Sequence, residues 1–146
     1  MFRMVTAASL AMLGLAVAAP ASARDDVLTF SIADVVDNPQ YAARLQGVKY
    51  FFADQAHPAV GKDLGEFQSN KKTNAFGKSD KEACEWAFLS ALLSFHDRAL
   101  AEGGDAVVNI HGFYKKQEFK SDTQFQCGAG ATVAGVTLKG TVVKLK

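Results

Sequence analysis

The chain has 146 residues, of which 49% are hydrophobic and 21% are charged, and its formal net charge at pH 7 is +1. Chains of this length usually form one domain with a single sizeable core. A nearly neutral domain has no overall electrostatic field to draw it onto nucleic acid or an anionic membrane, so we expect no nucleic-acid partner.

The first part of the chain, residues 1–23, has the pattern of a secretory signal peptide. Arg3 precedes an apolar run of about 15 residues, and Ala21 and Ala23 stand at the −3 and −1 positions of an A-x-A cleavage site. A membrane-spanning helix needs roughly 20 apolar residues, so this run is short for a permanent anchor. We predict a periplasmic protein that is cleaved after Ala23, has no membrane anchor after cleavage, and forms one domain from residues 24–146. An uncleaved N-terminal anchor is the alternative.

Short elements are expected in the first half of the mature chain. Pro39 suits the first turn of a helix, where its missing N–H needs no partner. In chain order we expect a strand at 27–32, a helical turn at 33–36, a short helix at 40–46, a strand at 48–52 and a more weakly indicated strand at 62–69. The last of these is weak because its inward residues, Leu64 and Phe67, are three positions apart and Gly65 lies between them.

One long helix is predicted from residue 80 to residue 102. Ser79 and Glu82 have the S-x-x-E spacing of a capping box, and Gly103 follows as a stop. Apolar residues recur at i, i+3, i+4 and i+7, and flanking leucines widen the stripe until only a narrow polar strip remains. A sheet covers one face of such a helix. The rest of its apolar surface must be covered by the N-terminal segment or by another protomer.

Strand-like segments follow the helix. We expect strands at 106–110, 123–127 and 131–145, and an exposed strand end at 115–120. Gly135 and Gly140 lie inside the last strand region and indicate bulges or a close approach of backbones. Together these elements predict a single α+β domain, in which a small mixed or antiparallel sheet of about five strands packs on one long helix.

The two cysteines, Cys84 and Cys127, are expected to form a disulfide bond. An exported chain meets an oxidising environment, where two thiols are usually crosslinked. A reactive or metal-binding thiol pair is the alternative. That pair would normally have a C-x-x-C spacing or a third ligand nearby, and the sequence has neither.

A polar, basic cluster is the strongest candidate for ligand or partner binding. It consists of Asn70, Lys71, Lys72 and Asn74, in a segment that the sequence places in a surface loop or a strand end. Such a cluster suits an anion, an acidic glycan or a partner protein, and a solvated surface without function is the alternative. A second basic stretch at 115–120 forms one patch with it if the fold brings the two together.

Candidate catalytic residues are few. The three histidines, His57, His96 and His111, form no H-E-x-x-H motif, and no serine stands in a G-x-S-x-G motif. A phosphate loop needs Gly-Lys-Ser/Thr at the start of a helix, whereas residues 139–141 read Lys-Gly-Thr within a strand-like run. We therefore expect no catalytic residue, no metal site and no cofactor.

Five segments carry a resemblance to a known family: residues 69–75, 83–92, 104–110, 127–130 and 136–140. They resemble a family of small secreted proteobacterial proteins that are often labelled as the ATPase subunit of the excinuclease ABC complex. The label implies a DNA-repair ATPase. That activity needs a phosphate loop, an ABC signature, zinc-binding cysteines and a cytosolic location, and this sequence has none of these features.

A second, looser resemblance starts at about Ser79. Ala99, the glycines 103–104 and the strand-like segment 105–110 are similar to the outer-membrane stress-sensor lipoprotein of the Rcs phosphorelay. They are also similar to the oligomeric YbjQ-like domains, which are named as heavy-metal-binding. The resemblance implies a helix packed on a small antiparallel sheet. The chain lacks a lipobox cysteine and has two cysteines rather than four, and it has no cluster of metal ligands.

The sequence as a whole favours a non-enzymatic periplasmic binding or interaction module with a role in envelope stress or homeostasis. The expected partner is an envelope protein or an anionic ligand, and homo-oligomer formation is left open. Two alternatives remain: a small exported enzyme with a dispersed site near His96 or His111, and the ATPase of the family label.

Overall fold

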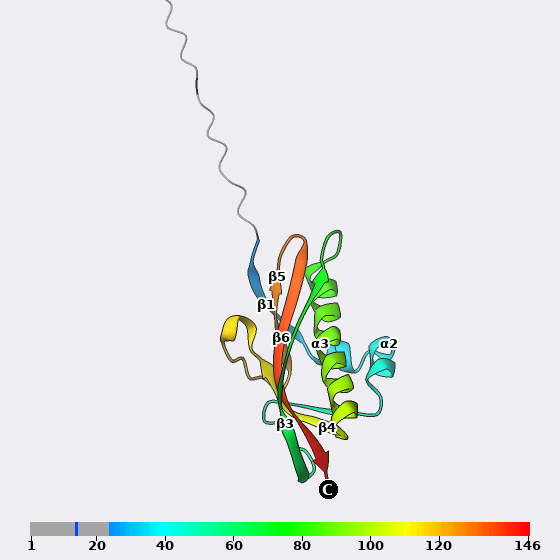
Figure 1. Ribbon diagram of the computed structural model, residues 1–146. Helices are drawn as coiled ribbons and strands as arrows, with labels where there is room; N and C mark the ends of the chain where they lie inside the picture. The colour runs from blue at the N-terminus through cyan, green and yellow to red at the C-terminus, as the bar shows by residue number, and fades with distance from the viewer. Residues whose placement is uncertain (1–13, 15–23) are drawn as a thin grey trace, which may run out of the picture.

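The computed structural model describes Gly14 and residues 24–146, so the predicted signal peptide (apart from Gly14) and its cleavage site lie outside the described residues. The chain order, shown in Figure 1, is β1 (Asp26–Ser31), α1 (Ala33–Val36), α2 (Pro39–Ala42), η1 (Ala43–Leu45), β2 (Lys49–Phe52), β3 (Val60–Asn74), α3 (Asp80–Glu102), β4 (Ala106–Gly112), η2 (Tyr114–Lys116), β5 (Gln124–Ala129) and β6 (Val133–Leu145). In the described part of the chain, no helix is both long and apolar enough to cross a membrane.

Strand β6 organises the sheet. Its whole length pairs with β3, and its other side pairs first with β5 and then with β4. Strand β1 extends the sheet from β5, and β2 extends it from β4. The β2–β4 pair is parallel and the others are antiparallel, so the predicted α+β domain is confirmed with a mixed sheet. The sheet has six strands instead of about five.

Strand β3 is longer than its sequence indicates. It runs from Val60 to Asn74, so the basic cluster belongs to the end of this strand. Its pairing with β6 shifts between Asp63 and Glu66, where Gly65 has a φ of +110°. Such a bulge inserts one residue and changes which side the following side chains face. This explains how Leu64 and Phe67, three positions apart, both pack against the core.

Helix α3 begins and ends where predicted. The Ser79 hydroxyl accepts a hydrogen bond from the Glu82 N–H at 3.1 Å, and Gly103 closes the helix in the left-handed conformation, with a φ of +77°. One side of the helix packs on the sheet. The other side is covered by the segment from α1 to η1, where the Tyr41 ring meets the Trp86 ring edge-on at 5.5 Å. The sequence left open whether the N-terminal segment or another protomer covers this side of α3, and the structure shows that the N-terminal segment does.

The face of the sheet away from α3, which we call the outer face, is covered by two smaller structures. At one end, Ala106, Val108 and Val143 form a second small core. Nearer β5, the chain after β4 turns over the sheet through η2, on the side opposite α3 (Figure 1). The predicted strand end at 115–120 is wrong, because Lys115 and Lys116 have φ values of 52° and 61° and bend the chain into a turn.

Candidate functional site

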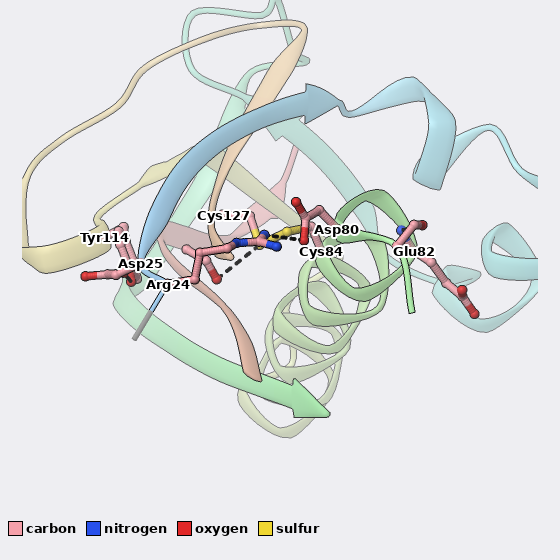
Figure 2. The surroundings of a disulfide bond; sticks show 9 residues. Arg24, Asp25, Asp80, Glu82, Cys84, Tyr114 and Cys127 are labelled. Carbon is pink, nitrogen blue, oxygen red and sulfur yellow. Dashed lines mark hydrogen bonds and ion pairs between the residues drawn. A yellow bond between two sulfur atoms is a disulfide. The ribbon is translucent and has the colours of Figure 1, made fainter. Parts of the chain in front are cut away.

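The disulfide between Cys84 and Cys127 is present, as predicted. It joins the start of α3 to β5 across a Cα–Cα distance of 5.8 Å, and both cysteines are fully buried. Beside it, the Arg24 guanidinium binds Asp80 of α3 (Figure 2). The disulfide and this ion pair hold β1 and β5 in place against the helix, and these two strands carry part of the candidate site.

A groove of about 420 Å³ lies on the outer face of the sheet. We call it the outer groove. Its floor consists of Gly128, Gly130 and Gly135, and its two sides are formed by Tyr114 with Lys115 and by Asn70 with Lys72. Arg24, Asp25, Val133 and Thr137 complete the lining.

The glycine floor follows from the strand register. Gly128 of β5 pairs directly with Gly135 of β6, and Gly135 pairs with Lys72 of β3. Paired residues point their side chains to the same face, so Gly128 and Gly135 add no side chain of their own to the outer face between β1 and Lys72. A Cβ atom at Gly135 would meet only Lys72 Cγ at 3.5 Å and the Lys71 carbonyl oxygen at 3.7 Å. The floor at Gly135 is therefore open.

The Tyr114 side of the groove is firmly held. A Cβ atom at Gly128 would lie 2.1 Å from Tyr114 Oη, so the tyrosine rests directly on this glycine. Tyr114 Oη donates a hydrogen bond to Asp25 Oδ1 at 3.3 Å, and Lys115 Nζ lies 2.5 Å from Asp25 Oδ2. The bond from Lys115 lowers the pKa of the Asp25 carboxyl, and burial raises the pKa of Tyr114. Asp25 thus ties η2 to the start of β1.

The positive charges of the groove differ in how far they are compensated. The Arg24 guanidinium pairs with Asp26 and Asp80, and Lys115 pairs with Asp25. Lys72 makes no ion pair with any carboxylate of residues 24–146. Lys72 is thus a cation without a carboxylate partner in this part of the chain, and its side chain lies beside the open floor at Gly135.

The structure separates the four predicted binding residues. Asn70 and Lys72 line the outer groove. Lys71 pairs with the buried Val136 and faces α3, where it borders a shallow hollow with Ser94 and Asp97 of that helix. Lys72, being on the edge strand, borders this hollow as well. Asn74 is used locally, because its Oδ1 accepts a hydrogen bond from the Phe76 N–H at 3.0 Å.

The two basic stretches meet at one point, as the sequence allowed, since Lys115 and Lys72 line the same groove. Sequence reasoning missed Asp25, Tyr114 and Thr137. It read Gly135 as a bulge or close approach, although the β6 pairing there is regular and the glycine leaves open space. The glycines between residues 128 and 135 were the one sequence signal for the groove floor. They form a floor only because β5 pairs with β6, which the sequence does not show.

The histidines lie apart from one another. His96 lies on α3, and its Nε2 is 2.8 Å from the Gln46 carbonyl oxygen. The His57 ring lies beside the Phe51 ring, with centroids 5.6 Å apart and the planes tilted by 56°. His111 is buried, its Nδ1 lies 2.7 Å from the Asn109 carbonyl oxygen, and its Nε2 is 3.8 Å from Glu118. The cavity beside His111 measures about 10 Å³, which is room for about one water molecule. Among the described residues, no three His, Cys, Asp or Glu side chains group as a metal site.

The Lys139-Gly140-Thr141 segment lies within β6 and opens no helix. A Cβ atom at Gly140 would be 2.9 Å from a methyl group of Val107, so this glycine serves close packing under α3. Lys139 Nζ lies over the Phe113 ring at 3.7 Å. The segment is therefore part of a packed strand and lacks the position at a helix N terminus that a phosphate loop has.

Comparisons with protein-family models, curated proteins and solved structures gave no match. Both resemblances seen in the sequence therefore stay predictions.

Proposed function

We propose that this chain is an exported, non-enzymatic binding domain that takes a small anionic ligand in the outer groove. The observation that carries the proposal is that Lys72, which makes no ion pair with a carboxylate of residues 24–146, lies beside the open floor at Gly135. A role in envelope stress or homeostasis, and an envelope protein as source or recipient of the ligand, belong to the same proposal.

The size and chemistry of the groove support a small anion. Its volume of about 420 Å³ falls in the range of roughly 300–1,000 Å³ that is typical of small-molecule sites. Lys72 offers a charge-assisted hydrogen bond, and Asn70 and Thr137, which face each other across β3 and β6, add an amide and a hydroxyl group. A phosphate or carboxylate group on a compact ligand fits this set of donors.

Export is supported by the buried disulfide. Crosslinks of this kind form and persist in oxidising compartments and are rare in the cytosol. Together with the signal-peptide pattern of residues 1–23, the disulfide favours a periplasmic location.

The enzyme alternative has a weaker basis in the structure. His111 and Glu118 do bring an imidazole near a carboxylate. The adjoining cavity, however, has no room for a substrate. We therefore argue the binding function.

A single substitution tests the groove. Gly135→Val fills the floor with a side chain that strands tolerate well, at a position where a Cβ atom meets nothing closer than 3.5 Å. Thr141→Val, on the same face of β6 but outside the groove, is the matched control. Calorimetric titration would use pyrophosphate and trigalacturonate as probes for phosphate and carboxylate ligands.

We expect the wild-type protein and Thr141→Val to bind at least one probe, and Gly135→Val to bind neither at an unchanged melting temperature. Equal binding by Gly135→Val would place the ligand elsewhere. If the wild-type protein bound neither pyrophosphate nor trigalacturonate, the proposal would be contradicted.

A further inference from the structure

The backbone of Arg24 lies at the outer groove while its side chain points away. Arg24 lines the groove, and its carbonyl oxygen is 3.1 Å from the position of a Cβ atom at Gly130, on the groove floor. Its guanidinium, however, turns toward Asp80 and the disulfide, as Figure 2 shows, while Asp25 turns the other way toward Tyr114. What Arg24 presents to the groove is thus its main chain.

Cleavage after Ala23 would change the charge of that main chain. In the longer chain the Arg24 nitrogen belongs to a neutral peptide bond. Hydrolysis of this bond consumes one water molecule: the Ala23 carbonyl carbon gains the hydroxyl and leaves with the leader as a carboxylate, and the Arg24 nitrogen becomes an α-ammonium group. An α-amino group has an ordinary pKa of about 7.7–8.0, so most of it is charged at pH 7.

The carboxylates next to this nitrogen already have partners. Asp25 is bound by Lys115 and Tyr114, and Asp26 is bound by the Arg24 guanidinium. A new α-ammonium group would therefore meet carboxylates that are already engaged. The α-ammonium group of Arg24 would then be a second cation of the groove, beside Lys72, that makes no ion pair within the protein.

We propose that the ligand site is completed by the α-ammonium group of Arg24, which removal of the leader creates. The anion then contacts both this group and the ammonium group of Lys72 within the outer groove. The unprocessed chain carries the same groove with one cation fewer. This inference rests on the proposed function and on the predicted cleavage after Ala23.

The test compares two forms of the mature domain that have the same net charge. One begins at Arg24, and the other begins at Ser22, which keeps an α-ammonium group but moves it by two residues, about 7 Å along an extended chain. Residues 24–146 contain all the strands and helices described above and both cysteines. Affinity for pyrophosphate is measured by calorimetry, with the melting temperature as the check on folding.

We expect the form that begins at Arg24 to bind pyrophosphate about tenfold more tightly, which corresponds to the loss of one charge-assisted hydrogen bond in the extended form. Equal affinities, together with loss of binding in Gly135→Val, would overturn this inference and leave the proposed function standing. Failure of both forms to bind pyrophosphate and also trigalacturonate would overturn both.

Discussion

Lys71 and Lys72 are neighbours in the sequence, but their side chains lie on opposite faces of the sheet. Lys71 pairs with Val136 on the face that packs on α3, whereas Lys72 pairs with Gly135 on the outer face. This follows from the alternation of side chains along a strand. The pair is therefore two separate charges, one of which borders the groove floor.

The first prediction concerns this separation. Lys72→Ala should weaken pyrophosphate binding about tenfold, because it removes the uncompensated cation from the groove. Lys71→Ala, its matched control, should change the affinity less than twofold, since that side chain faces α3. Calorimetric titration of both variants decides the matter, and equal losses in the two would argue against the outer groove.

The second prediction concerns the disulfide. The variant with both Cys84→Ala and Cys127→Ala should lose about 3–4 kcal/mol of unfolding free energy, because the crosslink closes a loop with a sequence separation of 43. The measurement is urea denaturation. The reduced wild-type protein should be destabilised to a similar extent, and a loss below about 1 kcal/mol would contradict a stabilising role.

The third prediction concerns the contact between Gly128 and Tyr114. Gly128→Ala should destabilise the protein by about 1–3 kcal/mol, because the added methyl group would overlap the tyrosine and force it off the sheet. Gly135→Ala, on the paired residue, meets only ordinary contacts and serves as the control. Equal stability of the two variants would show that Tyr114 does not rest on Gly128.

The fourth prediction concerns pH. The pKa of Asp25 is lowered by Lys115, and the pKa of Lys115 is raised by Asp25. A carboxyl with a lowered pKa stabilises the folded state at pH values above its unfolded-state pKa of about 3.9. This stabilisation is lost as the pH falls through the folded-state pKa. Lys115 stabilises the folded state at pH values below its unfolded-state pKa of about 10.4. This stabilisation is lost as the pH rises through its raised folded-state pKa.

The link between η2 and β1 should therefore hold from about pH 4 to about pH 10 and loosen outside this window. Amide hydrogen exchange at Tyr114 and Lys115 over a pH series, corrected for intrinsic rates, measures the loosening. Asp25→Asn should show weakened protection at every pH. If the acid loosening persisted unchanged in Asp25→Asn, another group would be responsible.

Local patterns in the sequence were enough for α3 and for the disulfide. The capping pair Ser79 and Glu82 and the stop at Gly103 act within one turn of the chain, so their meaning does not depend on distant residues. The cysteine pairing followed from the expected compartment rather than from geometry, and the structure confirms it.

The candidate groove was beyond the reach of the sequence, because it depends on register between distant strands. Gly128 and Gly135 become a floor only when β5 and β6 pair, and Lys72 borders it only when β3 pairs with β6. The bulge at Gly65 had hidden β3 by breaking its two-residue period. The left-handed conformations of Lys115 and Lys116, which turn the chain back toward β4 after Tyr114, are unusual for lysine and could not be predicted from the sequence pattern.

The place of β6 in the chain has a consequence for biosynthesis. Three other strands hydrogen-bond to it, yet it comes after all of them in the order of translation. A polypeptide growing from its N terminus cannot complete this sheet until residues 133–145 have left the ribosome. Until then β3, β4 and β5 lack the strand to which all three of them pair.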